Sequence, residues 1–168
     1  AENTARRKRG ELKNRRRKEM SGFHKSHPEV AMEKNTWFHL GRNSCEEILY
    51  CLRRIADPCE EHVDNNFVPL SKEQVKEYIP LRDTVLFLLR RTEKILQTDS
   101  YDEVDEVRRE AEELKDCLEK AREAQMQRMQ SSKENIAVAY LYLNLLQETR
   151  ELTSSLRHLL RASKGFRE

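Results

Sequence analysis

The sequence predicts an all-α protein, built as an antiparallel bundle of long amphipathic helices. First, the chain has only four glycines and four prolines among 168 residues, whereas β-sandwiches and barrels use both residues in their many turns. Second, charged residues make up 37% of the chain, a proportion typical of helices with exposed polar faces. Third, apolar residues recur every three or four positions in four segments, which places them on one face of a helix. The longest strongly apolar run, residues 85–89, is far shorter than the ~20 residues that cross a membrane.

Residues 1–30 form a basic segment that differs from the rest of the chain. Residues 1–20 contain nine Lys or Arg and three Glu, whereas residues 21–168 carry a net negative charge. We expect the segment to be partly helical or disordered, with its first ten residues frayed. Such a segment can contact an anionic membrane surface or nucleic acid, or remain in water. The side chains that would make the contact are Arg6, Arg7, Lys8, Arg9, Lys13, Arg15, Arg16, Arg17 and Lys18.

The first strong apolar stripe predicts a helix over residues 36–66. Pro58 is expected to bend this helix locally, and residues 26–28 look like a break before it. Trp37, the only tryptophan, is expected to anchor the core or the end of the helix. The stripe consists of Phe38, Gly41, Cys45, Ile48, Leu52, Ile55, Cys59 and His62.

The second stripe predicts a helix that begins after Ser71 and ends near residue 97. Ser71 with Gln74 has the spacing of a capping box, in which each residue bonds the backbone of the other. Pro80 cannot donate a backbone hydrogen bond, so we expect a kink there or a short helix over 72–78 followed by a longer one. The stripe consists of Leu81, Val85, Leu88, Thr92 and Ile95.

The third stripe predicts a helix that starts at a second capping box, Ser100 with Glu103. Acidic residues fill its first turn, where the helix dipole favours them. The stripe consists of Val104, Val107, Ala111, Leu114, Leu118 and Ala121.

The fourth stripe is the most regular and predicts a helix of some thirty residues. A capping box over residues 131–134 is expected to start it, and Gly165 to end it. Tyr140 and Tyr142 flank the stripe, so we expect their hydroxyl groups to reach the rim of the bundle. The stripe consists of Ile136, Ala139, Leu143, Leu146, Thr149, Leu152, Leu156 and Leu159. Because the connections between the last three helices are short, neighbouring helices should be antiparallel.

Motifs that bind cofactors or support catalysis do not occur in the sequence. It has no Glu-x-x-His pair of a di-metal bundle, no glycine-rich phosphate loop and no nucleophile elbow. Cys59 and His62 lie one helical turn apart, with Cys45 on the same stripe, but this is at most half of a zinc site and core packing is the preferred interpretation. The cysteines are expected to be reduced and buried. We therefore predict that the chain is not an enzyme.

Two segments, residues 52–61 and 146–153, look alike and carry a resemblance to a known family. Both resemble the third-helix signature of PhoU-type three-helix repeats, and the match is best in the first segment. On this resemblance, residues 31–168 form a PhoU-like bundle. Within it, residues 71–163 are one whole repeat and residues 36–66 are the last helix of a partial first repeat. The positions that align with the signature are Leu52, Arg54, Ile55, Ala56 and Asp57.

Residues 35–40 and 61–67 further resemble the C-terminal region of bacterial sodium/phosphate cotransporters. In that family the PhoU-like bundle follows the membrane domain and faces the cytoplasm. The resemblance implies a non-catalytic regulatory and interaction domain that modulates phosphate uptake at the cytoplasmic face of the bacterial inner membrane. Its partners would be the membrane domain of the same parent transporter and a second copy of the domain in a homodimer. The basic segment would then be juxtamembrane and contact anionic lipid, and the chain would be a piece of a longer protein.

Two other functions remain open on the sequence alone. One is a soluble helical scaffold, and the other is a nucleic-acid-associated protein that uses the basic segment as an arm. The acidic composition of residues 21–168 and the lack of aromatic residues between the basic ones count against the second. We therefore expect no nucleic-acid partner.

The metal sites of the PhoU family are not retained in full. The resemblance implies metal binding through two carboxylates four residues apart. Here the corresponding pairs are Arg53 with Asp57 and Gln147 with Glu151, so each pair keeps one carboxylate. A cationic guanidinium beside the site repels a metal ion. We expect no metal cluster and no other cofactor; the residues left to bind a divalent metal are Asp57 and Glu151.

Overall fold

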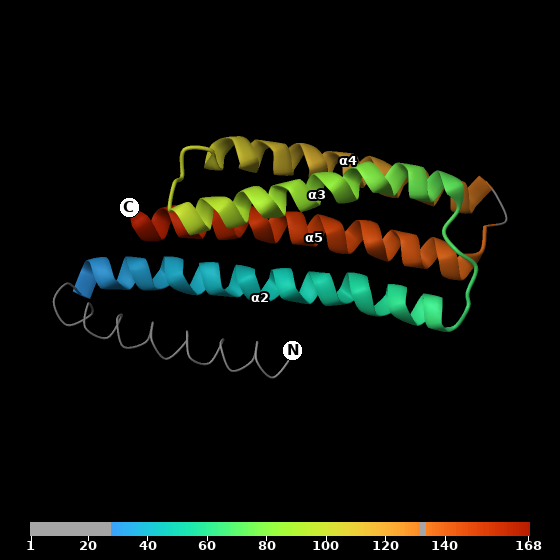
Figure 1. The fold of residues 1–168 in the computed structure, drawn as a ribbon, viewed down its shortest axis with the longest axis horizontal. Helices are drawn as coiled ribbons and strands as arrows, with labels where there is room; N and C mark the ends of the chain where they lie inside the picture. Colours follow the sequence, from blue (N-terminus) through green and yellow to red (C-terminus); the bar gives the residue numbers. More distant parts are fainter. Residues whose placement is uncertain (1–27, 132–133) are drawn as a thin grey trace.

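The computed structural model of the protein describes residues 28–131 and 134–168, which form four helices and no strand (Figure 1). Consecutive helices run in opposite directions. The predicted all-α bundle is therefore confirmed. No helix in these two ranges is long and apolar enough to cross a membrane. The helices are α2 (Pro28–Asp64), α3 (Lys72–Thr98), α4 (Val104–Ser131) and α5 (Ile136–Arg167).

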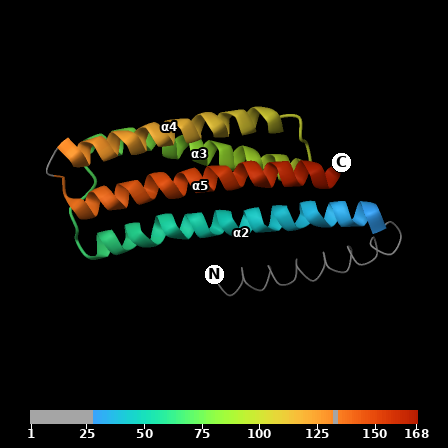
Figure 2. The same ribbon diagram turned by 180° about the vertical axis from the view of Figure 1, so that it is seen from behind.

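The central element is α5, which packs against all three other helices, whereas α2 packs against α5 alone. Figure 2 shows α5 between α2 on one side and the pair α3 and α4 on the other. Because it has neighbours on both sides, α5 buries more than the single predicted stripe, and Tyr142 is completely buried instead of lying at the rim. Ile136, the first residue of that stripe, is exposed.

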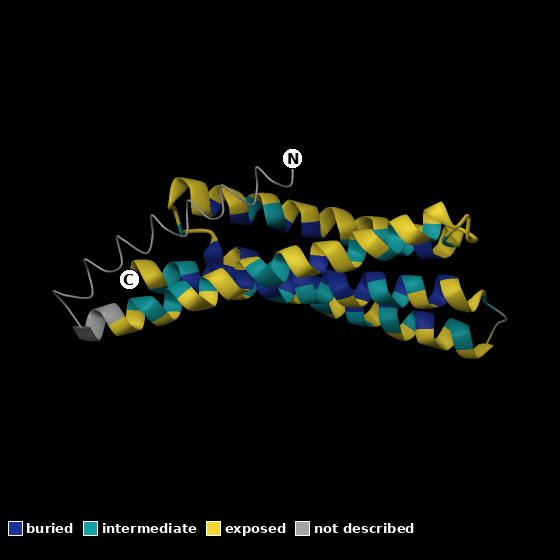
Figure 3. Ribbon diagram, turned by 90° about the horizontal axis from the view of Figure 1, so that it is seen from below, coloured by how far each residue is buried: buried dark blue, intermediate teal, exposed yellow. Residues whose placement is uncertain are grey.

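The predicted stripes of α3 and α4 mostly form the inner faces of these helices. In α3 the last four members of the stripe are buried, and in α4 all six are buried. Figure 3 shows that buried residues gather where helices meet, while the outer faces are mostly exposed. The core therefore lies among α3, α4 and α5 and extends to one face of α2.

The helix α2 begins at Pro28, eight residues before the predicted start. Proline is favoured in the first turn of a helix, because its missing N–H group has no acceptor there, so the expected break is the helix start. Pro58 lies inside α2 and Pro80 inside α3 without interrupting either helix. The prediction of two separate helices around Pro80 is wrong.

Of the three predicted capping boxes, only the one at α3 is formed. Gln74 N–H donates to Ser71 Oγ at 3.1 Å, and Ser71 N–H donates to Gln74 Oε1 at 2.9 Å. The box over residues 131–134 is wrong, because Ser131 ends α4 and Asn135 caps α5 by accepting from the Val138 N–H at 3.2 Å.

The connection between α3 and α4 also differs from the prediction. Ser100 Oγ donates to Asp102 Oδ2 at 3.3 Å instead of capping the helix. Glu103, the other half of the predicted box, accepts a hydrogen bond from Arg91 of α3 at 3.2 Å. The helix α4 begins at Val104, where the N–H group bonds Tyr101 O.

Gly165 lies inside α5 and does not end the helix. A Cβ atom at this position would be 2.6 Å from Cε2 of the Trp37 ring. The glycine is therefore required by the close approach of Trp37, which lies inside α2 and packs against the C-terminal end of α5.

Candidate functional site

The basic segment cannot be placed. All nine Lys and Arg side chains between Arg6 and Lys18 lie outside the residues that the structure describes. Their contact with a membrane surface or another anion stays a prediction.

Asp57 and Glu151, the two metal ligands that the resemblance to PhoU-type repeats leaves, lie on different helices. Asp57 is exposed on α2, whereas Glu151 is half-buried on α5 and accepts a hydrogen bond from Gln147 at 2.9 Å. Among residues 28–131 and 134–168, no three His, Cys, Asp or Glu side chains come together in a way that could hold a metal ion. The imidazole of His62 lies 2.7 Å from Val68 O of the following loop, which ties this side chain to the α2–α3 connection.

The cysteines are less buried than expected. All four are thiols, but only Cys51 is buried, while Cys59 is half-buried and Cys45 and Cys117 are exposed. Burial raises the pKa of the Cys51 thiol to about 11. The Cys51 side chain is therefore protonated near neutral pH and acts as a small packed group rather than a nucleophile.

The two segments that resemble the PhoU signature face each other across the α2–α5 interface. Arg54 of α2 donates from Nε to Glu148 Oε2 of α5 at 2.8 Å and from Nη2 to Glu47 Oε1 at 2.8 Å. Asn144 of α5 donates to the backbone oxygen of Arg54 at 3.0 Å. Glu148 is only 9% exposed, whereas the Arg54 side chain is 44% exposed, so the pair lies at the edge of the α2–α5 interface.

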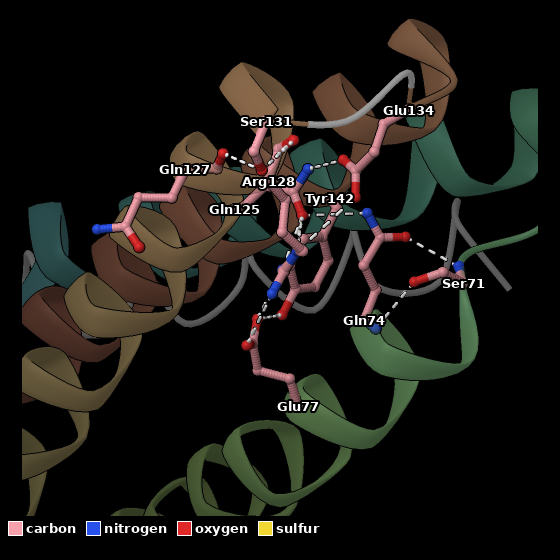
Figure 4. Close-up of polar contacts among 9 residues, drawn as sticks. All are labelled: Ser71, Gln74, Glu77, Gln125, Gln127, Arg128, Ser131, Glu134 and Tyr142. Atoms are coloured by element: carbon pink, nitrogen blue, oxygen red, sulfur yellow. Dashed lines mark hydrogen bonds and ion pairs between the residues drawn. The ribbon is translucent and has the colours of Figure 1, made fainter.

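A larger polar cluster joins α3, α4 and α5 at the end of the bundle where α3 and α5 begin and α4 ends (Figure 4). The buried amide of Gln74 donates to Gln125 Oε1 at 3.2 Å, and Gln125 donates in turn to Glu134 Oε2 at 2.6 Å. We call the following six residues the polar cluster: Gln74, Glu77, Gln125, Arg128, Glu134 and Tyr142.

The charges of the polar cluster are arranged around Arg128. Its guanidinium donates to Glu77 Oε1 at 3.2 Å and to Gln125 Oε1 at 2.8 Å, and lies over the Tyr142 ring. The Tyr142 hydroxyl donates a short hydrogen bond to Glu77. Burial, followed by the hydrogen bond to Glu77 and the negative charge of Glu77, holds the pKa of Tyr142 well above its usual value. The phenol thus remains a hydrogen-bond donor.

The polar cluster is suited to fixing three helices against one another rather than to chemistry on a substrate. Its carboxylates and amides are engaged with each other, and buried polar groups satisfied in this way specify one packing arrangement. Sequence reasoning missed the cluster, although a signal was present. Gln125 follows the apolar stripe of α4 by one helical turn, and Gln74 precedes that of α3 by two turns. A polar residue at such a position indicates a buried hydrogen-bonding partner.

Two apolar stripes are exposed that the sequence did not indicate as such. The one on α2 includes Cys45, Leu52 and Cys59 of the predicted packing stripe, and of these Cys45 and Leu52 are exposed instead of packed. On α3, five apolar residues and two charged ones recur every three or four positions. Most of them follow directly after a residue of the packed stripe in the sequence. We call these seven residues the α3 stripe. Its members are Val75, Ile79, Arg82, Leu86, Leu89, Glu93 and Leu96. On α2, the α2 stripe follows the same spacing, and its members are Cys45, Leu49, Leu52, Ala56, Cys59 and Val63.

The two stripes lie on the sides of α2 and α3 that α5 leaves uncovered. Burial raises the pKa of Tyr78 on α3, with a smaller contribution from Cys59 of the α2 stripe, yet no Cα atoms of α2 and α3 pack within 8 Å. Leu52 is 41% exposed and Leu86 44% exposed. Contiguous apolar surface of this kind marks a site of protein–protein contact.

Comparison of the chain with models of protein families, with curated proteins and with solved structures gave no match. The resemblance to PhoU-type repeats therefore rests on the quoted sequence segments.

Proposed function

We propose that this chain is a non-catalytic regulatory and interaction domain of a bacterial sodium-dependent phosphate transporter, located on the cytoplasmic side of the membrane. The observation that carries the proposal is the Arg54–Glu148 contact between the two signature-like segments. Such a contact is expected if α2 is the closing helix of one three-helix repeat and α3, α4 and α5 form the next. The all-helical bundle is consistent with this division of the chain.

The domain would act through its helix faces. The polar cluster and the Arg54–Glu148 pair are occupied in holding helices together, whereas the α2 and α3 stripes leave apolar surface for a partner. The partners are the membrane domain of the parent transporter and a second copy of the domain, and the basic segment would contact anionic lipid beside the membrane domain. Binding at these faces would shift the balance between conformations of the membrane domain only if the affinity differs between them.

Sodium-dependent phosphate uptake by the parent protein tests this function. We would compare the intact parent with a variant that lacks residues 28–168 but keeps the basic segment, at equal amounts in the membrane. The expected result is a changed uptake rate or a changed response of uptake to phosphate supply. Unchanged uptake and unchanged response would rule out the regulatory role.

Two further observations separate the transporter proposal from the alternative functions. The transporter assignment requires membrane-spanning segments encoded upstream of Ala1, and a start codon directly before Ala1 would contradict it. A nucleic-acid-associated protein would instead bind DNA or RNA through the basic segment, with an affinity that falls steeply as salt rises. Salt-sensitive binding in a gel shift, lost when residues 6–18 are replaced by neutral ones, would favour that alternative.

A further inference from the structure

The α3 stripe has the spacing of a coiled-coil seam. Its seven positions alternate steps of four and three residues from Val75 to Leu96, which is the heptad pattern of positions a and d. Val75, Ile79, Leu86 and Leu96 are each between 38% and 44% exposed. The helix therefore packs with one face into its own bundle and presents a second heptad stripe toward solvent, in which Leu89 is half-buried against the core.

The charged members of the stripe are placed in a way that points to one partner. Arg82 and Glu93 are its only charged residues, and they stand on either side of its apolar centre, Leu86 and Leu89. Arg82 contacts its sequence neighbour Asp83 at 2.8 Å, and Glu93 accepts from Gln97 in the next turn at 3.1 Å. Both are local contacts on the surface of α3, and such exposed contacts are readily exchanged.

We propose that α3 is a self-association surface, on which a second copy of this chain docks with its α3 antiparallel to the first around a two-fold axis. Positions a of one helix then face positions d of the other. Three residue pairs meet across the interface, and the two-fold axis repeats each of them. Together they form six layers over about 26 Å of helix. The partners are Ile79 with the partner's Leu96, Arg82 with the partner's Glu93, and Leu86 with the partner's Leu89.

Other arrangements of two α3 helices mismatch the charges. Shifting the antiparallel register by one heptad sets Arg82 against the partner's Leu86, or, in the other direction, Glu93 against the partner's Leu89. A parallel pair in register sets Arg82 against the partner's Arg82. Each alternative desolvates an unpaired charge or brings like charges together, which is unfavourable. The proposed register is the one in which both charged positions meet an opposite charge.

The residues beside the stripe favour the same register. Asp83 and Arg90 are exposed and follow directly after Arg82 and Leu89. In the proposed register Asp83 lies near the partner's Arg90, so opposite charges flank the apolar layers on both sides of the axis. After a shift of one heptad toward the N-terminus, Asp83 would instead lie near the partner's Asp83. Flanking charges of this kind set orientation and partner choice in coiled coils.

The α2 stripe adds to the surface that a second copy can cover. Leu52, Ala56 and Val63 are exposed on the same face of α2 as Cys59. A single helix pair buries little area, whereas stable interfaces bury over about 1,000 Å² in total. A partner resting on α3 and reaching the α2 stripe obtains a wider apolar contact. This inference does not depend on the transporter assignment.

Charge reversal with complementary variants tests the proposal in the full 168-residue chain. Sedimentation equilibrium should show a dimer for the unchanged chain. Arg82→Glu sets two glutamate–glutamate layers in the homodimer, and Glu93→Arg sets two arginine–arginine layers, so each variant should dimerise at least about tenfold more weakly. A mixture of the two variants should form a heterodimer, because both of its charged layers again pair opposite charges.

The control is Lys94→Glu. This variant changes the charge of α3 by the same amount as Arg82→Glu, but it lies at an exposed position outside the α3 stripe. It should leave dimerisation unchanged, and thermal unfolding of each variant checks that the fold is retained. A chain that stays monomeric up to its solubility limit would overturn the proposal. So would two weakened variants that show no preference for each other when mixed.

Discussion

At the residue scale, Gly165 determines how closely α5 approaches α2. Alanine is favoured over glycine inside a helix by about 1 kcal/mol, but at Gly165 its Cβ atom would lie 2.6 Å from the Trp37 ring. We expect Gly165→Ala to lower the free energy of unfolding by about 1–3 kcal/mol, because the ring has to move. Denaturant-induced unfolding measures this change.

Gly41 on α2 is the matched control. A Cβ atom there would be 3.6 Å from Ala162 Cβ, an ordinary packing distance. Gly41→Ala should therefore raise the free energy of unfolding by up to about 1 kcal/mol. If Gly165→Ala proved as stable as Gly41→Ala, the tight contact with Trp37 would be contradicted.

Tyr142 links the polar cluster to stability at alkaline pH. Burial and the negative charge of Glu77 raise the pKa of Tyr142 in the folded protein, whereas in the unfolded chain the pKa is about 10. The stabilisation is therefore fully present below pH ~10 and is lost as pH rises further, because only the unfolded chain releases the proton.

The Tyr142→Phe variant isolates this effect. Near neutral pH it should be less stable than the unchanged chain by about 1–2 kcal/mol, since Glu77 loses a donor. Above pH ~10 the difference should shrink by up to about 1.4 kcal/mol per pH unit. Urea unfolding at a series of pH values tests this, and a difference that is constant with pH would contradict the raised pKa of Tyr142.

At the element scale, the start of α5 shows why helix ends were harder to predict than helices. The sequence around residues 131–134 fits a capping box, but Ser131 Oγ donates to Gln127 O at 2.9 Å within α4, and Asn135 has the extended backbone and side-chain contact of the true cap. Several polar residues in a row offer several caps, and packing of α5 against its neighbours selects one.

Replacing each candidate cap separates the two possibilities. Asn135→Ala should lower the free energy of unfolding by about 1 kcal/mol, because the Val138 N–H loses its acceptor. Ser131→Ala should change it by less than about 0.5 kcal/mol, since its hydroxyl donates to carbonyl groups of its own helix. Equal losses in thermal or urea unfolding of the two variants would contradict the assignment of Asn135 as the cap.

At the scale of the whole molecule, the apolar stripes predicted the bundle but not the order of its helices. The packing stripes predicted for α3 and α4 are mostly buried in the structure, because 3–4 spacing follows directly from helix geometry. That α5 is central, with Tyr142 inside, depends on which helices surround it, and one amphipathic pattern does not contain this information. The polar cluster and the α3 stripe were missed for a related reason. The roles of Gln74 and Leu86 depend on which helices contact α3 and which side of α3 stays exposed.

The central position of α5 should appear in the exchange rates of its backbone amides. Helices open locally with a free energy that grows with the buried contacts they would lose. Fourteen residues of α5 are buried, whereas in the described part of α2 only Ser44 and Cys51 are. Hydrogen exchange should therefore be slowest along the middle of α5, faster in α3 and α4, and fastest in α2 and near the helix ends. Equal protection of α2 and α5 in the isolated domain would mean that α2 is held by contacts beyond its interface with α5.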